Sequence, residues 1–194
     1  MSLTTTQKVL LKGTLGSIDD AVLAIKYAIS KGAKIINCSW NFNEPFNDLY
    51  DVIKEHQEIL FVCAAGNSYT DIDIYSIFPC SYELENVISV MAIDNKGKPY
   101  HASGYGKNTV DIAAPGVSVK VILPENEETF IDGTSVATAF VTGAVTLMLS
   151  KDANLTPKEI REIVLSSATR KQELNSFCVA GGYLNIEECL ISIR

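Results

Sequence analysis

The chain has 194 residues, of which 47% are hydrophobic and 20% are charged, and its net charge is -7 at pH 7. This length and apolar content suffice for one domain with a sizeable core, so we expect residues 1–194 to form a single domain. The negative charge gives no basic field for phosphate backbones or anionic lipid, so nucleic acid and membrane surfaces are disfavoured as partners.

The first part of the chain predicts a strand followed by a helix. Residues 8–12 are a short strand-like run, and the hydroxyl of Ser17 can cap the helix that follows, because it can accept a hydrogen bond from a free backbone N–H. Apolar residues then repeat at helical spacing over residues 18–29, and Gly32 ends this repeat.

Three nearly continuous apolar runs predict buried strands. They cover residues 33–39, 59–65 and 87–93, and an amphipathic helix over residues 46–53 separates the first two. Such strands are typical of parallel sheets that carry helices on both faces, because neither face meets water. The alternation of strand and helix therefore predicts a three-layer α/β domain with a mainly parallel sheet.

The second half of the chain begins with shorter strands. Two short strands flank Pro115 within residues 110–123, and residues 125–128 are predicted to form an acidic loop in solvent. Residues 133–149 carry apolar or small side chains nearly all round at helical spacing. This pattern predicts a helix that runs buried through the core.

The last predicted elements are a capped helix and a tail. Thr156 and Glu159 form a capping box, with Pro157 at the first helical position. Residues 183–186 are predicted to be a short extended tail. Since no repeat and no low-complexity linker interrupts the chain, nothing indicates a second domain.

Cysteine usage bears on the compartment. The chain has five cysteines, and Cys38 and Cys63 lie inside apolar strand-like runs, where a free thiol behaves as a small buried hydrophobe. The odd number favours a reducing, cytoplasmic compartment over a disulfide framework, and no Cys/His cluster indicates a metal site. No apolar run approaches the roughly 20 residues that span a bilayer, and the first seven residues do not resemble a signal peptide, so we expect a soluble chain.

Two separate segments carry candidate chemistry. Ser135 lies where a loop meets the predicted buried helix, and the free N–H groups of a helix start favour an oxyanion beside it. On position alone, a helix N-cap is the better interpretation of Ser135. Asn67 follows the strand at residues 59–65, at the end where ligands bind in open α/β sheets. Its amide could donate to an oxyanion, and a turn-forming Asn is the alternative.

These segments carry a family resemblance. Residues 133–137 (GTSVA), followed by Val141 and Gly143, resemble the serine motif of the subtilisin-like serine peptidases, or subtilases. Other motifs follow the family's order: residues 35–39 (IINCS) resemble its substrate strand, 64–67 (AAGN) its oxyanion motif, 114–116 (APG) a core loop and 182–185 (GYLN) its closing segment. The resemblance runs from about residue 9 to residue 190 and implies the C-terminal part of a subtilisin-like catalytic domain.

The resemblance implies a role for each matched residue. Ser135 would be the nucleophile that forms the acyl-enzyme, and the Asn67 amide and the Ser135 backbone N–H would form the oxyanion hole. An extended peptide or protein substrate would pair with the cleft backbone. The residues implied to line that cleft are Ser39, Trp40, Asn41, Ala64, Ala65, Gly66 and Thr134.

The catalytic base is missing from the matched motifs. A serine hydroxyl needs a base and a carboxylate that orients the base. Neither His56 nor His101 lies in the helix start that carries the family's base, and no Asp lies in the family's Asp motif. In the family both motifs precede the first segment seen here. The resemblance therefore implies an incomplete domain that lacks the N-terminal strands and is inactive alone.

Other departures concern the serine helix and the sheet edge. Ala139 stands where the family usually has Pro, Phe140 where it has His, and Asn41 where it has a Gly that lets a peptide approach. Without the Asp strand, the strand at residues 34–39 becomes an open edge. We expect residues 8–11, the missing N-terminal segment or a second copy of the chain to pair there.

Alternatives to an enzyme remain open at this point. A non-catalytic protein with the subtilase fold could bind peptides or a protein partner. A nucleotide-binding domain is disfavoured because no Gly-rich phosphate loop follows a strand, and an α/β-hydrolase is disfavoured because the G-x-S-x-G elbow is absent. No cofactor is expected, although Asp71 and Asp73 are candidate ligands for calcium.

Overall fold

A six-stranded sheet organises the computed structural model, which describes residues 16–193. Its strand order is β1-β2-β3-β4-β8-β7, and every neighbouring pair is parallel except β7 with β8. The strands are β1 (Ile35–Cys38), β2 (Leu60–Ala64), β3 (Val87–Ile93), β4 (Ile112–Pro115), β7 (Thr169–Arg170) and β8 (Gly182–Tyr183).

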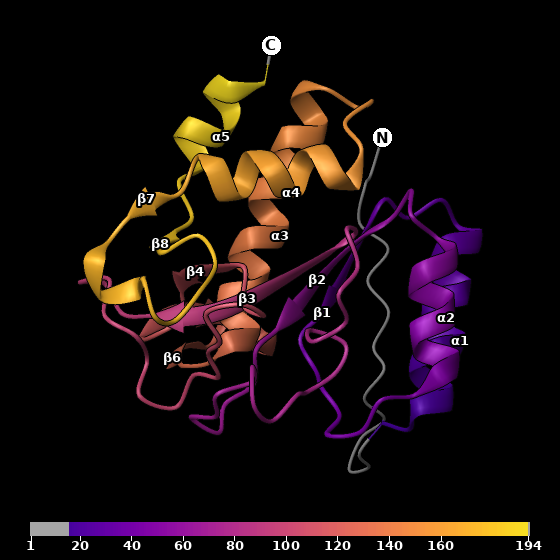
Figure 1. Ribbon diagram of the computed structural model, residues 1–194, viewed down its shortest axis with the longest axis horizontal. Coiled ribbons are helices and arrows are strands. Elements are labelled where there is room, and N and C mark those ends of the chain that lie inside the picture. Colours follow the sequence, from indigo (N-terminus) through magenta and orange to yellow (C-terminus); the bar gives the residue numbers. More distant parts are fainter. Residues whose placement is uncertain (1–15, 194) are drawn as a thin grey trace.

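Helices cover both faces of this sheet (Figure 1). A separate hydrophobic core lies on each face of the sheet. In β2, Phe61 and Cys63 pack into the first core, and Leu60 and Val62 pack into the second. The first core contains α1 (Ile18–Ser30) and α2 (Asn47–Glu55), and the second contains α3 (Thr134–Lys151), α4 (Pro157–Ser166) and α5 (Ile186–Ser192). The predicted three-layer α/β domain with a mainly parallel sheet is therefore confirmed.

The helix signals in the sequence are also confirmed. The Ser17 hydroxyl accepts from the Asp20 N–H at 3.1 Å, and Thr156 forms the predicted capping box with Glu159. Gly32 follows α1 with a φ of 78°, the left-handed conformation in which helices commonly end. These local hydrogen bonds satisfy backbone groups that a helix end would otherwise leave unpaired.

The core helix α3 is less enclosed than its sequence predicts. It packs against β1, β2, β3 and β4, but Phe140 and Leu147 on its other side are 39% and 51% exposed. The prediction of burial nearly all round was wrong, because the sheet covers only one side of the helix. Within residues 16–193, α3 is the one helix long and apolar enough to cross a membrane by length and composition, but its contacts are those of a core helix.

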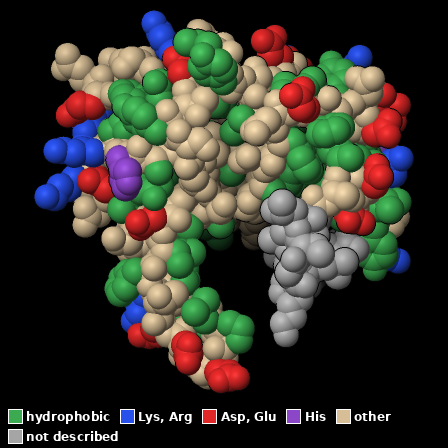
Figure 2. Space-filling view, turned by 90° about the horizontal axis from the view of Figure 1, so that it is seen from below, with side chains coloured by type: hydrophobic (Ala, Val, Ile, Leu, Met, Phe, Trp, Pro, Cys, Tyr) green, Lys and Arg blue, Asp and Glu red, His purple; other side chains and the backbone are tan. Residues whose placement is uncertain are grey.

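The acidic loop predicted at residues 125–128 is the exposed turn of a hairpin, except that Glu128 already lies in the second strand. The hairpin strands are β5 (Val119–Ile122) and β6 (Glu128–Ile131), joined by a 3-10 turn at Pro124–Asn126. Figure 2 shows the hairpin as an arm that projects from the body of the molecule, with acidic side chains at its end. Glu128 pairs with Lys120 across the two strands at 2.7 Å, so this glutamate belongs to a strand and not to a loop.

The C-terminal tail also differs from its prediction. The extended part is only β8, and Ile186 begins α5. The side chain of Asn185 accepts a hydrogen bond from the Glu188 N–H at 3.0 Å and thereby caps this helix. The prediction of an extended tail through residue 186 was wrong because this cap was overlooked.

Buried thiols and the end strand of the described sheet complete the fold. All five cysteines are free and buried, as predicted. Burial raises the pKa of Cys80 to about 12, which keeps this thiol protonated and unreactive. Within residues 16–193, β1 is the end strand of the large sheet. The strand expected at residues 8–11 lies outside the described residues.

Candidate active site

Three segments meet at the carboxyl edge of the sheet. Ser39 follows β1, Asn67 follows β2, and Thr134 begins α3. The Thr134 N–H and hydroxyl donate to Asn67 Oδ1 at 2.9 and 3.1 Å. The hydroxyl of Ser39 donates to the Ser135 carbonyl at 3.1 Å, and the hydroxyl of Ser135 donates to the Ser39 carbonyl at 3.3 Å. The structure therefore places these four residues in one site.

Gly133 makes this junction possible. Its φ of 145° is a conformation that other residues rarely adopt, so a side chain here would be strained even though its Cβ would meet Asn67 at an ordinary contact distance of 3.5 Å. Gly133 is itself the N-cap of α3, so the interpretation of Ser135 as N-cap was wrong. Ser135 lies inside the first turn, where backbone N–H groups have no partner within the helix.

The side chain of Asn67 has a defined orientation. Both donors from Thr134 reach Oδ1, which identifies that atom as the amide oxygen. Nδ2 has no acceptor among the described residues, and Asn67 is exposed. The turn that carries it is fixed by the Gly104 N–H, which donates to the Gly66 carbonyl at 2.7 Å. A free amide donor thus lies beside the N-terminus of α3, where negative charge is favoured.

A pocket of about 730 Å³ opens next to this turn. Of the predicted cleft residues, Asn41, Ala65 and Gly66 line it. Ala64 is 2% exposed inside β2, and Trp40 packs edge-on against Phe42 with 5.5 Å between ring centroids. The other residues that line the pocket are Asn43, Pro45, Ser68, Thr70, Tyr75, Ser76, Ile77 and Phe78. The wall at residues 75–78 was missed, because no local pattern marks it.

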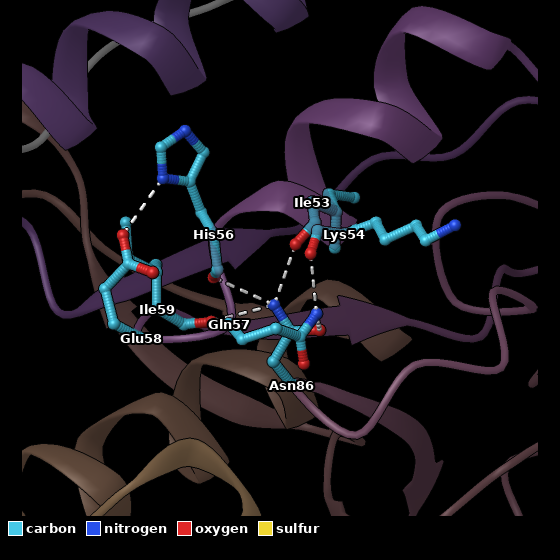
Figure 3. Close-up of polar contacts among 7 residues, drawn as sticks. All are labelled: Ile53, Lys54, His56, Gln57, Glu58, Ile59 and Asn86. Carbon is cyan, nitrogen blue, oxygen red and sulfur yellow. Dashed lines mark hydrogen bonds and ion pairs between the residues drawn. The ribbon is translucent and has the colours of Figure 1, made fainter.

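Neither histidine contacts Ser135. His56 ends α2 and its ring lies 2.9 Å from Glu58, and the neighbouring backbone is bound by Asn86, which precedes β3 (Figure 3). His56 thus lies at the amino edge of the sheet, with the length of β2, about 15 Å at 3.3 Å per residue, between it and the site. His101 is exposed and packs edge-on against Tyr100. Within residues 16–193, the Ser135 hydroxyl bonds only to Ser39.

The two candidate calcium ligands take part in loop contacts. Asp73 accepts from the backbone N–H groups of Asn108 and Thr109, and these bonds lower its pKa although partial burial opposes the shift. Asp71 accepts from the Asp73 N–H at 3.1 Å. Among the residues that the structure describes, no group of three His, Cys, Asp or Glu side chains is arranged to hold a metal.

The two residues after Ser135 that differ from the usual subtilase motif lie on the exposed side of α3. Ala139 and Phe140 line an apolar hollow of about 430 Å³ between α3 and the β5–β6 hairpin. Val136, which directly follows Ser135, lines the same hollow. Ser135 therefore lies between the end of β1, the Asn67 turn and this hollow, which begins at Val136.

Comparison with known proteins identifies the family. A model described as "Subtilase family" matches residues 6–181. Subtilisin DY from Bacillus licheniformis is 32% identical over 183 residues, which cover 93% of this chain and 65% of that protein. Subtilisin-like protease 3 from Plasmodium falciparum is 28% identical, with 92% of this chain and 26% of that protein covered. The chain thus spans less than two thirds of the length of these relatives.

A solved structure agrees with this assignment. The prenylagaramide maturation protease PagA superimposes with a TM-score of 0.83 at 30% identity, covering 96% of this chain and 71% of that chain. The match of sequence and fold extends over nearly the whole chain and includes the segments that form the site. The chain belongs to the subtilase family of serine proteases.

Proposed function

We propose that this chain contributes the nucleophile and the oxyanion donor of a subtilisin-type serine endopeptidase. The observation that carries the proposal is the orientation of Asn67, because Thr134 occupies its oxygen and leaves the amide nitrogen free beside Ser135. A turn-forming Asn would need no such fixed donor at a helix N-terminus. The base comes from outside residues 16–193.

The proposed reaction follows from this arrangement. Ser135 Oγ attacks the carbonyl carbon of the scissile peptide bond, and the base accepts the hydroxyl proton. The carbonyl oxygen becomes an oxyanion that accepts hydrogen bonds from Asn67 Nδ2 and the Ser135 N–H. The base then gives its proton to the leaving amine, the C–N bond breaks, and water hydrolyses the acyl-enzyme by the same steps in reverse order.

Ser39 and Asn41 support the binding of a peptide. They lie on the segment after β1, the end strand of the described sheet, where an added strand could pair with backbone groups other than the Ser39 carbonyl, which accepts from Ser135. The pocket at Gly66 lies beside the proposed oxyanion donor, where the side chain before the scissile bond would enter. A peptide or protein is therefore the proposed substrate.

The chain alone is proposed to be inactive. Without a base, the Ser135 hydroxyl keeps its proton, and in the structure it donates that proton to the Ser39 carbonyl. A protonated hydroxyl is a weak nucleophile near neutral pH. Neither His56 nor His101 can replace the base, because neither contacts this hydroxyl.

Labelling by a fluorophosphonate tests the proposal. It is measured on this chain and on the chain extended by the sequence that its gene encodes upstream, with Ser135→Ala as the control for each. The extended protein should be labelled at Ser135 and this chain should not, as read from the mass of the tryptic peptide. An extended protein that contains an Asp and a His motif but stays unlabelled would refute the proposal.

A non-catalytic peptide-binding protein is the second candidate. The bond from the Ser135 hydroxyl to the Ser39 carbonyl favours it, because no base among residues 16–193 contacts this hydroxyl. Under this alternative the cleft binds peptides while the extended protein also stays unlabelled. A gene without Asp and His motifs upstream would support it.

A further inference from the structure

The pocket beside Gly66 is uncharged. Its eleven lining residues supply carboxamides, hydroxyls and apolar groups, but no Asp, Glu, Lys, Arg or His. Two of them, Ala65 and Gly66, directly precede Asn67, so the pocket adjoins the proposed oxyanion donor. The proposed peptidase function would place in it the side chain of the residue that contributes the reacting carbonyl.

Asn41 presents its carboxamide to this pocket. A Cβ on Gly66 would lie 3.5 Å from Asn41 Nδ2 and 2.7 Å from Ile77 Cδ1, so the absence of a side chain on Gly66 keeps the space between these two groups open. Gly66 has a φ of 84°, which also disfavours any other residue. Asn41 is exposed, and within residues 16–193 its carboxamide has no hydrogen-bond partner, so its N–H donors and its oxygen can exchange water for a ligand.

The backbone that carries Asn41 is fixed. Phe42 exchanges two backbone hydrogen bonds with Phe78, each 2.8 Å long, and this ties the segment of Asn41 to the segment of Ile77. The ring of Phe42 also packs edge-on against Trp40 and Phe46, with 5.5 Å between centroids in both pairs. Asn41 is thus held at the pocket before a ligand arrives, which reduces the entropy lost on binding.

We infer that Asn41 is a specificity-determining residue and that the pocket selects an uncharged amide side chain, glutamine or asparagine, immediately before the scissile bond. The inference rests on the proposed peptidase function. A carboxamide can both donate to and accept from the Asn41 carboxamide. A carboxylate or an ammonium group would lose part of its hydration in a pocket that offers no opposite charge. An aliphatic side chain would displace water from the Asn41 carboxamide without replacing its hydrogen bonds.

Peptide binding tests the inference without requiring turnover. The protein is this chain with Ser135→Ala, and the probes are acetyl-Ala-Ala-Pro-X-Ala-amide peptides in which X is Gln, Glu, Leu or Lys. Isothermal titration calorimetry measures each Kd. The Gln peptide should bind about tenfold more tightly than its isostere with Glu, and about three- to tenfold more tightly than the Leu peptide, as expected for one or two neutral hydrogen bonds.

Variants of Asn41 locate the origin of the preference. Asn41→Gly should bring the Gln and Leu peptides within about twofold of each other, while Asn41→Asp should make Lys the preferred side chain. Asn126→Gly, an exposed residue of the hairpin outside the pocket, is the matched control and should leave all four Kd values unchanged.

The outcomes separate the inference from the function on which it rests. Binding of all four peptides with equal affinity, or a Gln preference that persists in Asn41→Gly, would overturn the inference alone. Binding of none of the peptides would overturn the proposed peptide cleft, and the inference with it.

Discussion

Replacement of Asn86 tests how the amino edge of the sheet is held. Asn86 is 1% exposed and directly precedes β3. Its Nδ2 donates to the carbonyls of Ile53, His56 and Ile59 at 2.9, 3.1 and 3.2 Å, and its Oδ1 accepts from Gln57 (Figure 3). One side chain therefore connects the end of α2, the start of β2 and the start of β3.

The expected cost follows from these contacts. The amide has two hydrogens for three carbonyls, so it is worth about two neutral hydrogen bonds, or about 2 kcal/mol. Two of the three carbonyls keep a backbone bond when the amide is removed, because the His56 N–H donates to Ile53 and the Ile59 N–H to His56. Asn86→Ala should therefore lower the free energy of unfolding by about 2–4 kcal/mol once desolvation of the remaining group is included.

An isosteric change sharpens this prediction. Asn86→Asp keeps the size of the side chain and the acceptor for Gln57, but it directs a carboxylate at three carbonyl oxygens. At pH 7, Asn86→Asp should lower the free energy of unfolding by more than Asn86→Ala does. The loss should be smaller at pH 4 than at pH 7, because the carboxyl can then hold a proton and donate it in a hydrogen bond. Urea unfolding followed by circular dichroism measures both variants, with Asn47→Ala as an exposed asparagine control. A loss below about 1 kcal/mol in Asn86→Ala would refute the assigned role.

Three further predictions concern the site and two carboxylates. Asn67→Asp keeps an acceptor for both threonine donors, so stability should change by less than about 1 kcal/mol. The labelling rate of Ser135 in the extended protein should fall by about two to three powers of ten, a magnitude known from subtilisin itself and not worked from this structure. Because the pKa of Asp73 is lowered from 3.8, its stabilising effect relative to Asp73→Asn should be lost as the pH falls below that value in urea titrations. Burial raises the pKa of Asp111 although Arg161 opposes the shift, so the wild type should lose stability relative to Asp111→Asn as the pH rises from 3.8.

The sheet and its helices could be predicted because their signals are local and strong. The strands β1, β2 and β3 lie in nearly continuous apolar runs, and the cap residues Ser17 and Thr156 act within one helical turn of their own positions. These features depend on neighbours in the sequence, so sequence alone carries them. The sequence also places a glycine before α3, but only the structure shows that Gly133 adopts a φ of 145°.

The β5–β6 hairpin and the pocket wall could not be predicted in the same way. Val119 and Val121 pair with Ile131 and Thr129 across an acidic turn, and the acidic residues hide this alternation. The wall at residues 75–78 reaches the pocket through the Phe42–Phe78 bridge, which joins segments far apart in the sequence. One side of α3 is exposed because no other element covers it. The sequence of α3 alone does not show which side other elements will cover.

The proposed nucleophile and the proposed oxyanion donor are held by contacts that do not involve a base. Asn67 is fixed by Thr134, and Ser135 is fixed by Ser39 and the start of α3. Because these contacts join segments that lie within the chain, the site can keep its shape whether or not an imidazole is present. Peptide binding and serine labelling therefore report different properties of this protein. Binding depends on the pocket and Asn41, whereas labelling depends on proton transfer from Ser135, so a chain that binds without being labelled would have an intact cleft and lack only its base.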